Sequence, residues 1–265
     1  MNQELERFEP TEEGGRIAYE HLHRYAICRE QVAGQRVLDV ACGAGYGTNI
    51  LAQVAAEATG LDIDAAAVRK AKRKYRRSNI KFVAGDCYDM PFEAGSFDVV
   101  VANEMIEHID DHDRFIDEVK RVLRPGGSLL VSTPNKPVYN RYKEPNVFHV
   151  SEMDIPEFHD LLEHYFEHVR FIGLRMALVS AGYDLDRNDQ ASNLAAAKTF
   201  KGVRLDQDRP EISNDDLALE DPEYVLAICS DRAIEKASSS STIFFSSESD
   251  LWLEHERIMD RMSTE

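Results

Sequence analysis

The sequence predicts an α/β fold built around a mostly parallel sheet, and three observations carry this prediction. Apolar stretches of strand length alternate with helical stretches from about residue 36 to residue 131, a pattern typical of parallel sheets covered by helices. The first stretch, residues 37–40, runs directly into a turn with glycines at positions 43, 45 and 47. A late apolar stretch, residues 223–230, supplies a final strand. The length of 265 residues allows one full α/β core and a modest appendage.

The same alternation predicts the other elements. A helix is expected over residues 17–32, before the first strand, and another over residues 48–58, directly after the glycine turn. Apolar runs and helical periodicity predict the rest. The further strands are expected over 59–64, 82–87, 97–102, 123–131 and 168–178, and a further helix over 151–164.

Changes in composition along the chain predict three consecutive segments. Residues 1–35 form an N-terminal helical lead, and residues 36–232 form the main domain. Within that domain residues 183–220, rich in Asp and Asn, predict a long surface insertion. Residues 233–265 predict a serine-rich linker and a short amphipathic helix. That helix either packs on the core or mediates self-association or contact with a partner module.

Composition and charge limit the classes of function that this protein can have. The formal net charge is −17, and a protein that neutralises many phosphates needs a cationic face, so nucleic acid is not an expected partner. The basic residues at 69–77 predict a solvated helix with cations near the negative end of its dipole. The acidic start, the absence of a long apolar run and four scattered cysteines predict a cytoplasmic protein with no membrane span and reduced thiols.

The glycine turn predicts a nucleotide site at the end of the first strand. Its Gly-x-Gly-x-Gly spacing differs from the dinucleotide pattern, and Asp39 just before it would repel a phosphate but favour a cationic or zwitterionic ligand. Asp62 ends the second strand, where a carboxylate holds ribose hydroxyls. Asp86 follows the third strand and suits an adenine amino group.

This ordered set, together with Phe97-Asp98 and Arg124-Pro125-Gly126-Gly127, resembles the class I S-adenosylmethionine-dependent methyltransferases over residues 36–134. The resemblance implies a Rossmann-like, seven-stranded, mostly parallel sheet with an antiparallel edge strand, and S-adenosylmethionine as cofactor. The residues expected to contact this methyl donor are Arg24, Asp39, Ala41, Gly43, Gly45, Asp62, Ile63, Asp86, Cys87 and Asn103.

A second group of residues follows the fourth strand. Glu104, Glu107 and His108 are related by i, i+3 and i+4, so a helical turn would place them on one face. His149, in the loop after the fifth strand, can reach the same pocket. Two carboxylates and two imidazoles beside a substrate predict a metal site with open positions. The alternative is a solvated acidic first turn stabilised by the helix dipole.

These four residues are similar to those of metal-dependent O-methyltransferases that carry a Glu-x-x-Glu-His turn. The resemblance implies a divalent metal, Mg or Mn, on Glu104, Glu107, His108 and His149, although two imidazoles also suit iron or zinc. Residues 6–10 and 20–25 are similar to methyltransferases of bacterial surface-polysaccharide gene clusters. We therefore expect O-methylation of a sugar or glycan hydroxyl, with His108, and next His149, as the base.

Three alternatives stay open from the sequence. A metal-free enzyme could methylate a small amine or phenol, with His108 only as base. A non-catalytic S-adenosylmethionine-binding module could organise an assembly through residues 250–262. An RNA methyltransferase would share the metal residues, but the net charge disfavours it.

Overall fold

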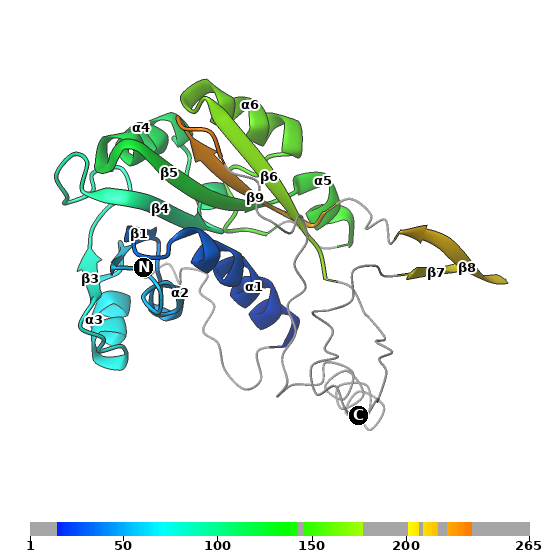
Figure 1. Ribbon diagram of the computed structural model, residues 1–265, viewed down its shortest axis with the longest axis horizontal. Helices are drawn as coiled ribbons and strands as arrows, with labels where there is room; N and C mark the ends of the chain where they lie inside the picture. The colour runs from blue at the N-terminus through cyan, green and yellow to red at the C-terminus, as the bar shows by residue number, and fades with distance from the viewer. Residues whose placement is uncertain (1–14, 143–145, 177–200, 207–208, 217–221, 235–265) are drawn as a thin grey trace, which may run out of the picture.

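A computed structural model describes residues 15–142, 146–176, 201–206, 209–216 and 222–234, coloured along the chain in Figure 1. Within these residues a seven-stranded sheet has the strand order β3-β2-β1-β4-β5-β9-β6. The strands are β1 (Arg36–Val40), β2 (Glu57–Asp62), β3 (Ile80–Ala84), β4 (Phe97–Asn103), β5 (Leu123–Pro134), β6 (His168–Leu174) and β9 (Tyr224–Ser230).

The predicted fold class is confirmed, including the antiparallel strand. β9 pairs antiparallel with both β5 and β6, whereas the pairs among β1 to β5 are parallel. The antiparallel strand lies one place inside the edge, because β6 pairs along its outer side. All seven residues of β9 are buried, as expected of a strand with neighbours on both sides.

Helices cover both faces of the sheet. Figure 1 shows α4 and α6 above the sheet and α1 and α2 below it. Side chains of β1 alternate between the two layers: Leu38 and Val40 pack in the cluster that contains α4 and α6, and Val37 packs in the cluster with α1 and α2. The helices are α1 (Gly15–Gln31), α2 (Tyr46–Leu51), α3 (Ala65–Lys74), α4 (His112–Val122), α5 (Lys136–Tyr139) and α6 (Ile155–Tyr165), with 3₁₀ turns η1 (Ile106–His108) and η2 (Asn140–Tyr142).

The helix after the glycine turn is shorter than the sequence predicts. α2 ends at Leu51 rather than near residue 58. Asn79 donates from Nδ2 to the carbonyl oxygens of Ala52 and Ala55, and Ala58 pairs with Val37 of β1. Tertiary pairing of this alanine-rich stretch therefore outweighs its local helix propensity.

The predicted insertion contains regular structure. β7 (Lys201–Asp206) and β8 (Arg209–Asp216) form a two-stranded antiparallel sheet. The predicted helix at residues 250–262 lies outside the described residues. Among the described helices, none combines the length and the apolar character that crossing a membrane would require.

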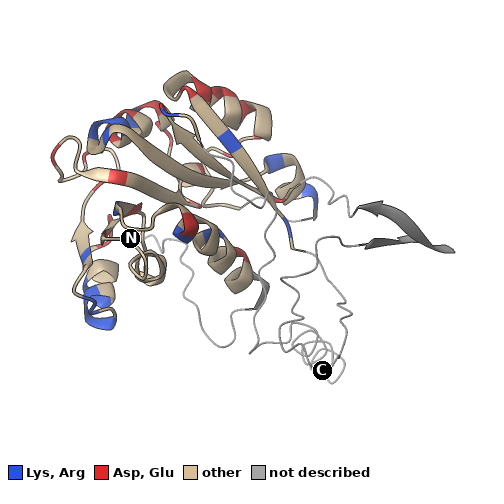
Figure 2. Ribbon diagram, viewed as in Figure 1, with Lys and Arg blue, Asp and Glu red and all other residues tan. Residues whose placement is uncertain are grey.

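The surface charge is unevenly distributed. Figure 2 shows Lys and Arg gathered on α3 and Asp and Glu on α6. The last turn of α3 carries Lys72, Arg73 and Lys74, and its N-cap Asp64 accepts a hydrogen bond from the Ala66 amide at 2.6 Å. Acid at the start and base at the end of a helix complement its dipole, which agrees with the interpretation of these cations as a solvated helix end.

Candidate active site

The predicted site residues gather at one edge of the sheet, which we call the carboxyl edge because the parallel strands end there. β1, β2, β4 and β5 all contribute their last residues to it. Antiparallel β9 contributes its first residue, since Tyr224 pairs with Pro134 at the end of β5. This edge divides into a donor half, at β1 to β3, and an acceptor half, at β4, β5 and the loop at residues 146–150.

The loop after β1 turns sharply through left-handed backbone. Ala41, Gly43 and Gly45 have φ angles of 55°, 52° and 81°. A Cβ at Gly45 would lie 2.7 Å from the Phe82 ring and 2.8 Å from the Ala71 Cβ, so this position has room only for glycine. A Cβ at Gly43 would meet nothing within 4 Å. Gly45 is thus required by the protein's own packing, whereas Gly43 has open space where its Cβ would lie.

Asp62 ties this loop to the second strand. Its Oδ2 accepts a hydrogen bond from the Gly43 amide at 2.8 Å, and its Oδ1 accepts from the Asp64 amide at 2.8 Å. A carboxylate oxygen has two lone pairs. Asp62 can therefore hold the loop and still accept hydrogen bonds from a vicinal diol such as that of a ribose.

Asp39 lies beneath the loop and is fully buried. Tyr25 donates its hydroxyl to Oδ1 at 3.1 Å, and Thr48 donates to Oδ2 at 2.6 Å. Burial raises the pKa of Asp39 to about 7, although the two hydroxyls counteract the rise. In this conformation the buried Asp39 supports the loop through Tyr25 and Thr48, whereas the sequence predicts that it contacts the methyl donor.

The far side of the donor half presents an apolar and an acidic side chain to solvent. Ile63 directly follows Asp62 and is strongly exposed. Asp86, two residues beyond the end of β3, is also exposed and caps its own turn by accepting from the Tyr88 amide at 2.9 Å. Cys87 is half-buried, and burial raises the pKa of its thiol to about 12. An apolar surface beside a carboxylate fits a planar base with an amino group.

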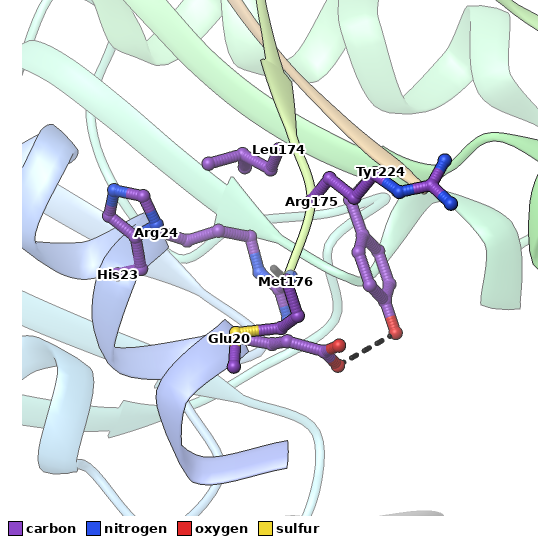
Figure 3. A pocket seen from close by; sticks show the side chains of 7 residues that line it. All are labelled: Glu20, His23, Arg24, Leu174, Arg175, Met176 and Tyr224. Atoms are coloured by element: carbon purple, nitrogen blue, oxygen red, sulfur yellow. Dashed lines mark hydrogen bonds between the residues drawn. The ribbon is translucent and has the colours of Figure 1, made fainter. Parts of the chain in front are cut away.

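Arg24 is a buried cation between the two halves. Its guanidinium lies 4.7 Å from the centre of the Tyr224 ring and 3.7 Å from Glu104 Oε1, measured from Nε. Nε and Nη1 make no hydrogen bond to any described residue. Figure 3 shows Arg24 among the side chains that line a small pocket, with the hydrogen bond from Tyr224 to Glu20 nearby. The unused donors fit the carboxylate of an amino-acid ligand.

Glu104 departs from the predicted arrangement. Its φ of 52° is left-handed, and it precedes the 3₁₀ turn η1 instead of belonging to a helical turn. Ser132 donates its hydroxyl to Glu104 Oε1 at 2.8 Å, on the side of Arg24. The prediction that Glu104 shares a helix face with Glu107 and His108 is therefore wrong. The neighbouring Asn103 is buried with its amide nitrogen 3.7 Å from Cys28 Sγ.

Glu107, His108 and His149 do meet. One ligand atom from each lies within 4.8 Å of the others, and Glu107 is almost fully buried. The two imidazole rings lie edge to face, with centroids 4.9 Å apart. One carboxylate and two imidazoles form a donor set suited to iron, manganese or zinc.

Hydrogen bonds orient both imidazoles. His108 Nδ1 lies 3.0 Å from the Phe148 carbonyl oxygen, and His149 Nδ1 lies 2.6 Å from Glu152 Oε1. Both partners are acceptors, so we assign the ring proton to Nδ1 in each case. The lone pair on Nε2 of His149 then accepts a hydrogen bond from Asn146 Nδ2 at 3.0 Å, which a metal at this nitrogen would have to displace. Metal-binding histidines typically have such partners on the second nitrogen.

Several supporting residues were missed in the sequence. Glu152 follows His149 by three residues, a spacing that could have suggested the pair, and Tyr139 stacks on the His149 ring at 5.5 Å. Tyr25 and Thr48 hold Asp39. Tyr25 gave no local signal, because its contact with Asp39 depends on how α1 packs.

Comparison with known proteins identifies the domain. Residues 38–131 match the family model described as a methyltransferase domain. A probable S-adenosylmethionine-dependent methyltransferase of Mycolicibacterium smegmatis is 40% identical over 141 residues, covering 52% of this chain and 54% of that protein. A fatty-acid O-methyltransferase of the same species is 37% identical over 130 residues, covering 46% and 47%. The chain thus spans about half the length of these curated relatives.

A solved structure shares the fold of this chain. The crystal structure of the PH0226 protein from Pyrococcus horikoshii is 25% identical, with a TM-score of 0.53, covering 62% of this chain and 89% of that one. Residues 38–131 thus match a methyltransferase domain, and a relative over this part of the chain is named a probable S-adenosylmethionine-dependent methyltransferase. The fold prediction is confirmed, and the match over residues 38–131 supports the predicted methyltransferase domain and methyl donor.

Proposed function

We propose that this protein is a metal-assisted O-methyltransferase that acts on a sugar hydroxyl of a bacterial glycan or glycan precursor. One observation carries the proposal: Glu107, His108 and His149 converge to within 4.8 Å at the carboxyl edge, beside the donor half. The sugar acceptor is supported by the similarity of residues 6–10 and 20–25 to polysaccharide-cluster methyltransferases and by the net negative charge, which disfavours RNA.

The donor half binds and orients S-adenosylmethionine in this proposal. Asp62 accepts from the ribose hydroxyls, the exposed Ile63 contacts the adenine, and Arg24 binds the carboxylate of the methionine part. The donor's sulfonium is already activated, so alignment of the acceptor oxygen with the methyl group supplies most of the rate enhancement.

The acceptor half makes the hydroxyl nucleophilic. A divalent cation held by Glu107, His108 and His149 would lower the pKa of a hydroxyl bound to it. Because Nδ1 of His108 is engaged, its Nε2 can serve either as a ligand or as a base, whereas Nε2 of His149 would have to give up its hydrogen bond to Asn146 before it could bind a metal. With both imidazoles as ligands the proton leaves to solvent, and without a metal His108 Nε2 is the proton acceptor.

Chelation tests the proposal directly. Purified protein is assayed for methyl transfer to a glycan panel by mass spectrometry, with Mg, Mn, Fe or Zn or with a chelator. Donor affinity is followed by calorimetry in the same buffers. We expect the chelator to abolish transfer and to leave donor affinity unchanged, because the metal residues lie outside the donor half. Full transfer in chelator would overturn the metal mechanism.

A matched pair of variants separates the two glutamates. Glu107→Gln should raise the metal concentration required for half-maximal activity by at least about tenfold, since an anionic ligand is lost. Glu104→Gln should leave that concentration unchanged, because Glu104 contacts Ser132 and Arg24 instead. Equal effects of the two substitutions would contradict the three-residue site.

A second candidate function follows from the fatty-acid O-methyltransferase relative. A carboxylate acceptor is already nucleophilic and needs neither a metal nor a base. Transfer to a fatty acid that persists in chelator and in Glu107→Gln would favour this candidate over the sugar acceptor.

A further inference from the structure

The loop beside the metal residues exposes an unusual amount of apolar surface. Val147, Phe148 and Val150 are 86%, 41% and 63% exposed. They are three of the five large apolar residues that are strongly exposed within the described part of the chain, and the other two, Ile17 and Ile63, lie on separate elements. Single exposed apolar residues are ordinary, but a cluster next to a site indicates a binding surface.

Backbone hydrogen bonds fix this loop against η1. The amides of Val150 and Ser151 donate to the Glu107 carbonyl oxygen at 2.9 and 3.1 Å. The Phe148 carbonyl oxygen accepts from His108 at 3.0 Å, and the Phe148 amide donates to Asn146 Oδ1 at 3.0 Å. The apolar side chains are therefore exposed by a loop whose main chain is bonded to the metal-residue turn.

The loop separates polar from apolar side chains. The side chain of His149 is only 5% exposed, with Nδ1 on Glu152 and the ring stacked on Tyr139. Its sequence neighbours on both sides, Phe148 and Val150, face solvent. The apolar surface thus begins one residue away from a metal-binding side chain, within reach of any substituent on a group bound there.

We infer that Val147, Phe148 and Val150 bind a hydrocarbon tail of the acceptor, so that the acceptor is an amphiphile. Its head carries adjacent oxygens that meet Glu107, His108 and His149, and its tail lies along the loop. This inference rests on the proposed function, because it takes the head to bind at those three residues. Beyond the proposed function, the inference implies that a free water-soluble sugar is a poor acceptor and that a lipid-linked sugar or glycolipid is a good one.

The direct test uses a probe that needs no knowledge of the sugar. 1-O-Octylglycerol carries a vicinal diol and an eight-carbon tail, and glycerol is the same head without the tail. Binding of each, below the micellar concentration, is measured by calorimetry with the donor product S-adenosylhomocysteine and manganese present. We expect the octyl compound to bind at least about tenfold more tightly. Equal affinities would overturn the inference.

Variants assign the tail preference to the loop. A triple substitution, Val147→Ser, Phe148→Ser and Val150→Ser, should remove the preference and leave donor affinity unchanged. Ile17→Ser is the matched control, because Ile17 is 54% exposed on α1, and it should keep the preference. Thermal melting checks that each variant is folded. A preference that survives the triple substitution would contradict the inference.

Failure of this inference and failure of the proposed function give different results. Dependence of methyl transfer on the metal tests how the acceptor head is bound, whereas dependence of affinity on tail length tests whether the loop binds the tail. If the tail preference persists in chelator and is lost only in the loop variant, the loop binds the tail but no metal takes part in acceptor binding. Loop-dependent binding to anionic vesicles without a preference for the monomeric octyl compound would overturn the inference in favour of membrane docking. A dimer that the triple substitution converts to a monomer would overturn it in favour of self-association.

Discussion

The donor and acceptor halves of the carboxyl edge are built in different ways. The donor half consists mainly of main chain, shaped by glycines and held by Asp62 across β1 and β2. The acceptor half consists of side chains from two segments about forty residues apart, joined by hydrogen bonds between η1 and the loop at 146–150. A glycine loop is specified by a short sequence, whereas the second arrangement depends on where a distant loop packs.

Substitution of Gly45 is the strongest way to separate the halves. Gly45→Ala forces a side chain into a φ of 81° and against Phe82, which should cost about 3 kcal/mol of unfolding free energy and abolish donor binding. Gly34→Ala has a similar φ of 70° but open space around the Cβ, so it should cost only about 1 kcal/mol. Denaturant unfolding and donor calorimetry measure both. Equal losses would show that strain alone, rather than packing, makes Gly45 necessary.

Replacement of Asp62 should act on the donor half alone. Asp62→Ala removes the acceptor of the Gly43 amide and the proposed acceptor of the ribose hydroxyls, so donor affinity should fall by about 1–3 kcal/mol. Manganese affinity, measured by electron paramagnetic resonance of the free ion, should not change. Unaltered donor affinity in calorimetry would remove Asp62 from the donor site.

The buried carboxyl of Asp39 predicts a pH dependence of stability. Its pKa is raised from 3.8 to about 7, so between these values the folded state holds a proton that the unfolded state has released. The protonated Asp39 therefore contributes to the free energy of unfolding. This contribution is fully present below about pH 4 and declines as pH rises to about 7, by at most about 1.4 kcal/mol per pH unit. Asp39→Asn should flatten that slope in urea unfolding at several pH values. An unchanged slope in this variant would mean that other titratable groups cause the pH dependence of stability.

The smallest effect is expected in the acceptor half, from Glu152→Gln. The amide retains an acceptor oxygen for His149 Nδ1 but loses the charge, so the ring is held less firmly. We expect about a fivefold increase in the metal concentration needed for activity, with donor affinity unchanged. Activity titrations with manganese test this, and Glu163→Gln on the exposed side of α6 is a neutral control. A change in donor affinity would mean that the halves are not independent.

The strands and the donor half could be predicted from the sequence because their signals are local. Each strand is a short apolar run, and Asp62 directly ends one of them. The position of the Glu104 side chain could not be predicted, because its left-handed backbone breaks the helical spacing that the sequence implies. The early end of α2 depends on Asn79, far along the chain. Of the four residues predicted to bind a metal, Glu107, His108 and His149 come together in the structure and Glu104 does not. Their proximity depends on how the loop at 146–150 packs, which the sequence does not show.

The packing of α1 has a consequence for which changes this chain tolerates. Two consecutive residues of the helix contact different halves, Tyr25 through Asp39 and Arg24 through Glu104. Successive residues of an α-helix are about 100° apart around its axis. A one-residue insertion or deletion in α1 after Tyr25 would rotate both side chains by about 100° relative to the sheet and away from their partners, even if the helix stayed intact. Exposed positions such as Ile17 can vary freely in side chain, whereas the number of residues between Tyr25 and β1 is fixed by both contacts.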